Sequence, residues 1–428
     1  MNFHTLPSLI ALAILVAIFR GIGRQTTSEQ LQLWLAGWCL VLVHFVAQFV
    51  DVQPGLVDRL ATAVGLGALE LASIVFLISV SPVATTRRRQ FVLAMGLGLP
   101  AFIYTNAAIW EVRSHSLYYA VILLAAAAAL TMIWTFYRKA TSFVVGESAG
   151  CLITVAAMVW AVHQNRPDLG IVLLLAALNF VAGALFWRHF RRFTAGVLTT
   201  VGGFFIWGAV FPAAVALQTF APSLHVEAEV WNIPKYFVAV GMILIMLEDQ
   251  IAKTEYLAYH DDLTGLPNRR LLEDRLEQAL TRADRSGSKV AVLLLDLDRF
   301  KEVNDTYGHR IGDLALKQVV MRLSGRMRMS DTLARSGGDE FTVVSDVSDA
   351  HGAQVLVSDL ELAFTVPFKL EGQLVNTGLS VGVALYPDDG RTSDQLLAAA
   401  DHAMYAAKRA SRGPGSLSTL PKFPKFPA

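Results

Sequence analysis

The sequence predicts two folds in tandem, a polytopic α-helical membrane domain followed by an α+β domain built as a ferredoxin-like palm. Apolar residues make up 54% of the 428 residues and charged residues only 17%, and the mean hydropathy is +0.47, a balance more apolar than that of an average soluble chain. Long apolar runs and short polar breaks alternate to about residue 250. Beyond about residue 260, short β-type runs alternate with amphipathic helical patterns.

The membrane domain is predicted to occupy residues 1–248 and to contain about nine helices, since each apolar run nears the length that crosses about 30 Å of hydrocarbon. The first run is short and Arg20 follows it, so a cleaved signal peptide is the alternative. No basic segment precedes that run and no small-residue cleavage site follows it, which favours a retained helix. The runs lie near residues 5–20, 31–50, 60–80, 91–110, 117–137, 143–162, 169–187, 196–218 and 231–248.

Basic residues at the ends of the runs predict the orientation, because basic ends tend to face the cytoplasm. The N-terminus is then outside and, after about nine crossings, the C-terminal domain is cytoplasmic. We therefore expect a multi-pass protein of a bacterial inner (cytoplasmic) membrane. The more basic ends hold Arg20, Arg24, Arg87, Arg88, Arg89, Arg138, Lys139, Arg188, Arg191 and Arg192, and the opposite ends hold Arg59, Arg113, Arg166 and Lys235.

Polar residues inside the apolar runs have two interpretations, a ligand site or hydrogen bonds between helices. Glu70 is the strongest candidate for a ligand site, and His44, Asn106 and Asn179 are weaker ones. Hydrogen bonding between helices, or a water-filled crevice, is the favoured explanation for all four. The two cysteines lie in apolar runs, so no disulfide framework is expected.

Residues 249–260 are predicted to form a helical linker, because neither glycine nor proline interrupts them. Alternating steps of three and four residues form a weak heptad seam, which would suit a dimer stalk. A solvated amphipathic connector is the alternative. The seam residues are Leu244, Leu247, Ile251, Thr254 and Ala258.

The α+β domain is predicted at residues 261–413, with its helices on one face of a sheet, and residues 414–428 read as a disordered tail because of their dense prolines. Asn268 is a good N-cap, and the apolar run 290–295 reads as a strand buried on both faces. The remaining predicted elements are a helix at 303–327 interrupted near Gly308 and Gly312, strands at 331–335 and 341–345, a helix at 350–365, strands at 368–370 and 374–384, and a helix at 393–409.

Three carboxylates are placed by these elements. Gly337 and Gly338 read as the tip of a hairpin, because glycine reaches positive φ at little cost, and Asp339 and Glu340 are expected on that tip. Asp296 ends the preceding buried strand. Hard oxygen ligands on two adjacent strands are what a divalent cation and a polyphosphate need. A solvated acidic turn is the alternative for the hairpin taken alone.

Four segments in this order closely resemble the GGDEF domain of diguanylate cyclases, and the resemblance covers residues 259–412 only. It implies an enzyme that joins two GTP molecules into cyclic di-GMP and releases two pyrophosphates, with Mg²⁺ (or Mn²⁺) as cofactor and as a homodimer, because one domain of the family holds one GTP. The segments are DDLTGLPNRR (261–270), DLDRFKEVNDTYGHRIGDLAL (296–316), RSGGDEF (335–341) and ADHAMYAAKRASR (400–412).

The resemblance also implies a role for each matched residue. The metal ligands would be Asp296, the Leu297 carbonyl, Asp339 and Glu340, with Asp339 also the proton acceptor and Glu340 part of the catalytic set. Lys301 would stabilise phosphate charge. The remaining implied contacts are Asn304, His309 and Asp313 to guanine, Lys408 and Arg412 to phosphate, and Arg328 and Asp331 to inhibitory product.

Two of these implied roles have a specific difficulty. Where the family usually continues with Gly-Arg-Asn, this chain has Ser411-Arg412-Gly413, so the reach of Arg412 differs from the family pattern. Arg328 and Asp331 have a simpler alternative, an ion pair three residues apart at the end of a helix.

Three other function classes are disfavoured by the sequence. A net charge of +1 gives no indication of nucleic-acid binding. A catalytically silent receptor that binds GTP or cyclic di-GMP and signals by protein contact is the main alternative, although the complete set of metal, base and phosphate positions disfavours it. A transporter would need paired broken helices or several buried charges, of which the sequence shows little.

Overall fold

The computed structural model describes residues 5–23, 28–50, 55–82, 84, 86–137, 141–224, 226 and 228–411. Arg412 and the predicted tail at 414–428 lie outside these residues. The chain divides into two compact units, Met1–Gln250 and Ile251–Ala428, which we call the helical unit and the sheet unit.

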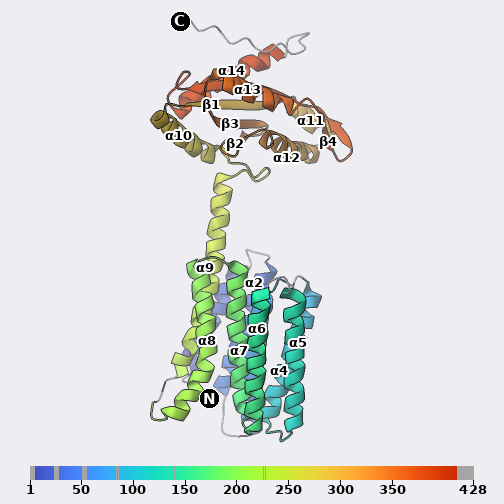
Figure 1. The fold of residues 1–428 in the computed structure, drawn as a ribbon, viewed down its shortest axis with the longest axis vertical. Helices are drawn as coiled ribbons and strands as arrows, with labels where there is room; N and C mark the ends of the chain where they lie inside the picture. The colour runs from blue at the N-terminus through green and yellow to red at the C-terminus, as the bar shows by residue number, and fades with distance from the viewer. Residues whose placement is uncertain are drawn as a thin grey trace. The chain divides into compact units, whose positions relative to one another are not determined.

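The helical unit is a bundle of long helices (Figure 1). Within the described ranges, nine helices are long and apolar enough to cross a membrane, which agrees with the nine apolar runs of the sequence. The helices are α1 (Leu6–Gly23), α2 (Glu29–Val50), α3 (Leu56–Ser79), α4 (Arg87–Ile109), α5 (His115–Tyr137), α6 (Thr141–His163), α7 (Pro167–Phe190), α8 (Ala195–Phe220) and α9 (Ala228–Tyr259).

Most helices extend a few residues past the predicted apolar runs, since polar residues continue or cap a helix where the hydrocarbon ends. Thr86 caps α4 by accepting a hydrogen bond from the Arg89 amide, and Thr194 caps α8 by accepting from the Val197 amide. Helix α9 continues without a break to Tyr259, so the residues predicted as a linker are helical up to that point.

Buried aromatic rings and glycines make the helices of this unit pack closely. Trp38, Phe76 and Phe204 lie in one contact chain, with ring centroids 5.2 Å apart for the first two and 5.9 Å apart for the last two. Gly203 brings α8 onto α9, since a Cβ at this position would lie 2.9 Å from the Val238 amide nitrogen. Small residues at such crossings let two backbones approach.

The polar side chains inside the predicted spans make hydrogen bonds, as favoured above. The Thr105 hydroxyl of α4 donates to the buried Glu70 carboxylate of α3, and His44 Nδ1 lies 2.9 Å from the Gly65 carbonyl oxygen. Asn179 donates to the Leu175 carbonyl oxygen at 2.8 Å, within its own helix. The interhelical explanation is thus confirmed for Glu70 and His44, whereas Asn179 and Asn106 each bond within their own helix.

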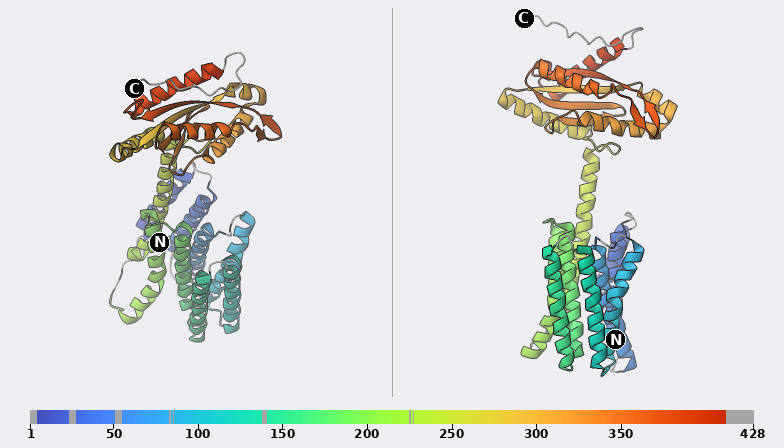
Figure 2. Two further views of the ribbon diagram at one scale, coloured as in Figure 1. Left: turned by 45° about the horizontal axis from the view of Figure 1, so that its top comes forward. Right: turned by 45° about the vertical axis from the view of Figure 1, so that its right-hand side comes forward.

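The sheet unit contains a four-stranded antiparallel sheet of order β2-β3-β1-β6 and a separate two-stranded sheet of β4 and β5 (Figures 1 and 2). An α+β fold was predicted, and this prediction is confirmed. The elements are α10 (Arg269–Ser286), β1 (Lys289–Asp298), α11 (Phe300–Tyr307), α12 (His309–Ser324), β2 (Thr332–Gly337), β3 (Glu340–Val347), α13 (Ala350–Leu362), β4 (Phe368–Leu370), β5 (Gln373–Val375), β6 (Gly378–Tyr386) and α14 (Ser393–Ser411).

Helices cover both faces of the main sheet, so the prediction of helices on one face is wrong. Along β1, Ala291, Leu293 and Leu295 pack into one apolar core with residues of α12 and α13. Val290 and Val292 point the other way, into a second core with α10 and α14. Alternate residues of a strand face opposite sides, and because both sets are apolar, both faces need a cover.

Three smaller element predictions are also corrected. Only Gly308 interrupts the helical stretch, since Gly312 lies inside α12. The strand predicted at 374–384 is two strands in different sheets, β5 and β6. Glu340 is not on the hairpin tip but is the first residue of β3, where it pairs with Asp296.

Candidate functional site

The site centres on an acidic corner where β1 and β3 meet. Asp296 of β1 is directly opposite Glu340 of β3, and side chains at opposed positions of an antiparallel pair share a face, with Cβ atoms about 4.5–5.5 Å apart. Asp339 precedes Glu340, and its carbonyl oxygen accepts a hydrogen bond of 3.3 Å from the Leu297 amide. The pairing therefore brings the three predicted carboxylates and Leu297 to one end of two strands.

The turn between β2 and β3 determines how Asp339 is presented. Gly338 has φ +48°, a left-handed conformation that glycine adopts without strain. The strand register shifts between Arg335 and Gly337, which is a β-bulge of the kind that re-aims side chains near functional sites. Asp339 is half-buried as a result, while Glu340 is exposed.

Burial and mutual repulsion disfavour the charged forms of these carboxylates. Partial burial raises the pKa of Asp339, and the charge of Asp296 raises it further, against the lowering effects of Lys408 and Arg335. Burial likewise raises the pKa of Glu340, helped by the charges of Asp296, Asp339 and Asp401. A cation bound among these oxygens would relieve that repulsion.

Lys408 already places a cation at this corner. Its ammonium, on the last turns of α14, donates to Asp296 Oδ1 at 2.6 Å, and the Asp296 side chain is only 8% exposed. Helix α14 lies close enough because Gly382 of β6 has no side chain, since a Cβ there would lie 2.1 Å from the Ala400 carbonyl oxygen. Arg412, the predicted partner of Lys408, lies outside the described residues.

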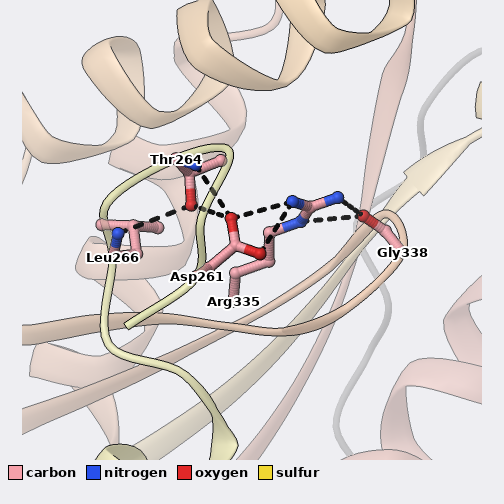
Figure 3. Close-up of polar contacts among 5 residues, drawn as sticks. All are labelled: Asp261, Thr264, Leu266, Arg335 and Gly338. Carbon is pink, nitrogen blue, oxygen red and sulfur yellow. Dashed lines mark hydrogen bonds and ion pairs between the residues drawn. The ribbon is translucent and has the colours of Figure 1, made fainter. Parts of the chain in front are cut away.

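A bidentate ion pair fixes the glycine turn to the segment before α10 (Figure 3). Arg335 donates to both carboxylate oxygens of Asp261, at 2.8 and 3.0 Å, and to the Gly338 carbonyl oxygen, at 2.9 and 2.6 Å. Asp261 Oδ1 also accepts from the Thr264 amide at 2.9 Å. Burial opposes ionisation of Asp261, but the hydrogen bonds from Thr264 and Arg335 outweigh it and hold its pKa below the usual range.

The residues predicted to read guanine gather at the corner between α11 and α12. Gly308, with φ +81°, ends α11 and starts α12. The Asn304 amide oxygen lies over Gly312, where a Cβ would approach it to 1.9 Å. Asn304 is therefore held against the turn of α12 that carries Asp313, and His309 begins that helix. Lys301 is exposed on the first turn of α11.

The predicted product site is a separate turn between α12 and β2. Asp331 Oδ2 accepts from the Arg328 amide at 2.8 Å, and its Oδ1 accepts from the Ser345 hydroxyl at 2.8 Å. The contact expected from the simpler alternative, an Arg328–Asp331 ion pair, is absent from the described residues. The Arg328 side chain is exposed, and a small groove of about 140 Å³ beside the turn is lined by Arg275 and Arg282 of α10, Ser330 and Thr332.

The acidic corner offers the oxygen ligands that Mg²⁺ prefers, but its side chains are not arranged as a complete metal site. Within the described ranges, no group of three or more His, Cys, Asp or Glu side chains is arranged to hold a metal ion. Asp296 and Glu340 supply carboxylate oxygens from facing positions, and hard cations prefer such oxygen ligands. The Lys408 ammonium on Asp296 is a cation at the place where the metal was predicted.

Comparison with known proteins identifies the sheet unit. Residues 258–414 match the family described as "Diguanylate cyclase, GGDEF domain", so this part of the chain is a GGDEF domain. The match confirms, for residues 258–414, the resemblance drawn from the sequence.

Two known proteins, and a solved structure of one of them, place the chain among its relatives. It is similar to the bifunctional diguanylate cyclase/cyclic di-GMP phosphodiesterase MucR of Pseudomonas aeruginosa, with 30% identity over 433 aligned positions, 94% of this chain and 60% of MucR. It is also similar to diguanylate cyclase TpbB of the same organism, with 43% identity over 176 residues, 41% of this chain and 40% of TpbB. A solved structure of a truncated TpbB, comprising only its GGDEF domain, has 44% identity and a TM-score of 0.35, covering 36% of this chain and 91% of that one. The chain thus spans 40–60% of the length of these two curated relatives.

The structure adds two features that the sequence analysis did not assign. Asp401 of α14 lies near enough to raise the pKa of Glu340, and only the packing of α14 on β6 reveals this. The Asp261–Arg335 ion pair spans 74 residues of sequence, so no local pattern predicts the partner of Arg335. The sequence shows only that Arg335 lies next to the Gly337–Gly338 turn.

Proposed function

We propose that this chain is a membrane-bound diguanylate cyclase that condenses two GTP molecules into cyclic di-GMP and two pyrophosphates. The observation that carries the proposal is the acidic corner, where Asp296 and Glu340 face each other beside Asp339 and under Lys408. The GGDEF family match and the similarity to proteins named diguanylate cyclases agree with it.

Each half of the reaction transfers one nucleotidyl group. The 3′-hydroxyl oxygen of one GTP attacks the α-phosphorus of the other, the bond between that phosphorus and the β-phosphate oxygen breaks, and pyrophosphate leaves. The hydroxyl proton passes to the Asp339 carboxylate, whose raised pKa suits a proton acceptor better than an ordinary carboxylate. Mg²⁺, when bound, screens the triphosphate and lowers the pKa of the hydroxyl.

The other residues of the site act by positioning and by charge, which dominate phosphoryl-type transfers. Asp296, Glu340, Asp339 and the Leu297 carbonyl would hold the metal. Lys408 is placed to exchange its bond with Asp296 for one with phosphate, because a lysine ammonium on a flexible stem can change partners.

Guanine recognition is assigned to the corner between α11 and α12. The amide of Asn304 and the carboxylate of Asp313 offer acceptors to the guanine N1–H and exocyclic amine, with His309 at the start of the same helix. Lys301 would face the triphosphate from α11, and by the family pattern Arg412 would also bind phosphate.

A homodimer is proposed because one GGDEF domain of this family holds one GTP. The predicted seam of α9 is available for that contact, since Leu247 and Ile251 are 46% and 58% exposed. Val240 and Phe237 continue the same three- and four-residue steps and are exposed as well. Such a seam supports pairing of two helices.

Product feedback is proposed at the turn between α12 and β2. Asp331 is held by two hydrogen bonds, and the Arg328 side chain is exposed. Arg275 and Arg282 line a groove with Ser330, which is two residues from Arg328 along the chain. Guanidinium groups bind phosphate and guanine edges through paired hydrogen bonds. Bound product would hold catalytic faces apart, so it should lower the rate without competing with GTP.

The decisive experiment is incubation of the purified full chain with GTP and Mg²⁺, with cyclic di-GMP and pyrophosphate measured by mass spectrometry. Formation of both in a 1:2 ratio is expected. Binding of GTP or cyclic di-GMP without turnover would contradict the proposal and support the silent receptor instead.

The proposed location is a bacterial inner membrane with the GGDEF domain in the cytoplasm. A reporter enzyme that works only in the cytoplasm should be active when fused after Leu247, and one that works only outside should be active when fused near Ser223. The opposite result at Ser223 would mean that the last two spans are assigned wrongly.

A further inference from the structure

The helical unit has a pocket of about 550 Å³ that is half open to the surface of the bundle and is lined mainly by α4, α5, α6 and α7. These four helices contact one another in a ring, α4 on α5, α5 on α6, α6 on α7 and α7 on α4, and they run side by side in the bundle (Figures 1 and 2). The volume falls in the range of about 300–1,000 Å³ that is typical of small-molecule sites.

The cavity exists because small residues occupy the facing surfaces of α5 and α6. Ala125 and Ala129 line it from α5, and Gly146 and Gly150 line it from α6. A Cβ built on either glycine would meet no atom within 4 Å. The space between packed helices is normally filled by side chains. The small residues at these positions leave space that larger apolar residues would fill.

One carboxylate faces this otherwise apolar space. Glu147 of α6 is the only charged side chain among the described lining residues, and it is half-buried. Neighbouring donors are engaged elsewhere, since the Thr154 hydroxyl donates to the Gly150 carbonyl oxygen at 2.9 Å and the Tyr104 hydroxyl donates to the Pro167 carbonyl oxygen at 3.2 Å. Across the described part of the bundle, no donor forms a hydrogen bond or ion pair with Glu147.

A carboxylate within a membrane-spanning helix is costly, and it usually faces a functional partner. The partner must present a hydrogen-bond donor or a positive charge, because a carboxylate can only accept. The rest of it must be apolar to match the alanine, leucine and valine walls. An acyl chain of a lipid satisfies the second condition and not the first.

We propose that this cavity binds a small apolar molecule that carries one amine group, with the amine on Glu147 and the apolar body between α5 and α6. The inference does not depend on the proposed cyclase activity. It gives the helical unit a role in binding a ligand, whereas the hydropathy of the sequence indicates only membrane-spanning helices.

The proposal is tested on the full chain in detergent micelles with a dansyl-labelled primary alkylamine and its N-acetylated analogue, which lacks the charge. Wild type should bind the amine at least about tenfold more tightly, because charge-assisted hydrogen bonds are roughly twice as strong as neutral ones. Glu147→Gln should remove this preference, and Gly150→Leu should abolish binding of both probes by filling the cavity.

Gly96→Leu is the matched control. Gly96 is an exposed glycine of α4 that also has no atom within 4 Å of a built Cβ, and it does not line the cavity. This variant should bind both probes as wild type does. If Gly150→Leu binds as well as Gly96→Leu, the probes lie elsewhere and the proposal is overturned.

A second measurement needs no substitution. Cys151 lines the cavity, whereas Cys39 is exposed on α2. The amine probe should slow alkylation of Cys151 by N-ethylmaleimide and leave that of Cys39 unchanged, as followed by mass spectrometry. Equal protection by the amine and its acetylated analogue, in wild type and in Glu147→Gln alike, would indicate an acyl-chain site and overturn the role of Glu147.

Discussion

The two units of the chain differ in how their buried polar atoms are bonded. In the described residues, every buried side-chain nitrogen or oxygen that lacks a hydrogen-bond partner belongs to the helical unit. In the sheet unit, the buried carboxylate of Asp296 is bonded to Lys408, and buried Ser345 and Ser380 are bonded to Asp331 and Asp298. The unpartnered atoms of the helical unit belong to Gln30, Trp38, Glu70, Tyr118, Ser148, Asn179, Arg192, Trp207 and Glu248.

This difference reflects two ways in which buried polar groups obtain hydrogen bonds. A helix bonds its own backbone, which the hydrocarbon requires, so a spanning bundle can fold with few polar side-chain contacts. A sheet domain joins segments that are distant in sequence, and buried polar groups there are costly unless bonded. Polar substitutions should therefore have large, specific effects in the sheet unit and small ones in the helical unit.

The largest effect is expected at the acidic corner. Asp339→Ala or Asp296→Ala should lower cyclic di-GMP synthesis by about 10²–10⁴-fold, the range for loss of a positioned acid or base, while the protein stays folded and in the membrane. Synthesis is measured by mass spectrometry of product at saturating GTP. Glu277→Ala removes an exposed carboxylate of α10 and should have no effect. Near-normal turnover in Asp339→Ala would remove the corner from the mechanism.

The next effect is expected at the Asp261–Arg335 ion pair. Asp261→Asn should cost about 1.5–3 kcal/mol of local stability, because it weakens charge-assisted hydrogen bonds. Faster hydrogen–deuterium exchange is expected in the peptides that hold residues 261–268 and 335–341. Asp262→Asn, which changes the exposed neighbour, should exchange as wild type does.

The same pair gives a pH dependence with a definite sign. Since the pKa of Asp261 is lowered in the folded state, its contribution to stability is present above its unfolded pKa and is lost as the pH falls through the folded pKa. The difference between wild type and Asp261→Asn should therefore shrink on acidification below about pH 4. A constant difference across that range would show that Asp261 acts through packing rather than charge.

A smaller effect is expected on feedback. Arg328→Ala should raise the inhibitory concentration of cyclic di-GMP by about tenfold, the equivalent of one charge-assisted hydrogen bond, with little change in the initial rate. Progress curves with and without added product measure this. Arg326→Ala, an exposed arginine two residues away, serves as control. If both variants slow with product as wild type does, the turn has only a structural role.

The smallest effect is expected inside the helical unit. Thr105→Val removes the donor to Glu70 and should destabilise the bundle by only about 0.6 kcal/mol, the mean for hydrogen bonds between membrane helices. Thermal unfolding in detergent compares it with Thr219→Val, whose hydroxyl bonds only the Val215 carbonyl of its own helix. A cost of several kcal/mol at Thr105 would break the contrast between the two units.

The sequence predicts the helical unit well as a set of spans, because hydropathy acts on each helix separately. It also predicts the strands that carry Asp296, Asp339 and Glu340, since an uninterrupted apolar run and a double glycine are local signals. The family motifs then indicate which of the carboxylates and basic residues belong to one site.

The rest depends on contacts between distant segments. The sequence shows that β1 is apolar on both sides, and this requires helices on both faces of the sheet. The sequence does not show which helices cover which face. The strand predicted at 374–384 is wrong because the chain leaves one sheet at Val375 and enters the other at Gly378, and the short Asn376-Thr377 break does not indicate a change of sheet. The bonds from Lys408 to Asp296 and from Arg335 to Asp261 join residues 112 and 74 positions apart, which periodicity does not address.

Gly382 restricts which sequences can carry this site. Any side chain there meets the Ala400 carbonyl oxygen and the Met404 amide nitrogen, at 2.1 and 2.2 Å from its Cβ, so α14 has to move away from β6. Lys408 lies one turn beyond Met404 on the same helix, about 6 Å along its axis, and would be carried away from Asp296. A methyl group at position 382 can thus act on the charge balance of the acidic corner without touching any of its members, and substitution of this glycine would inactivate descendants of this chain whose motifs are all intact.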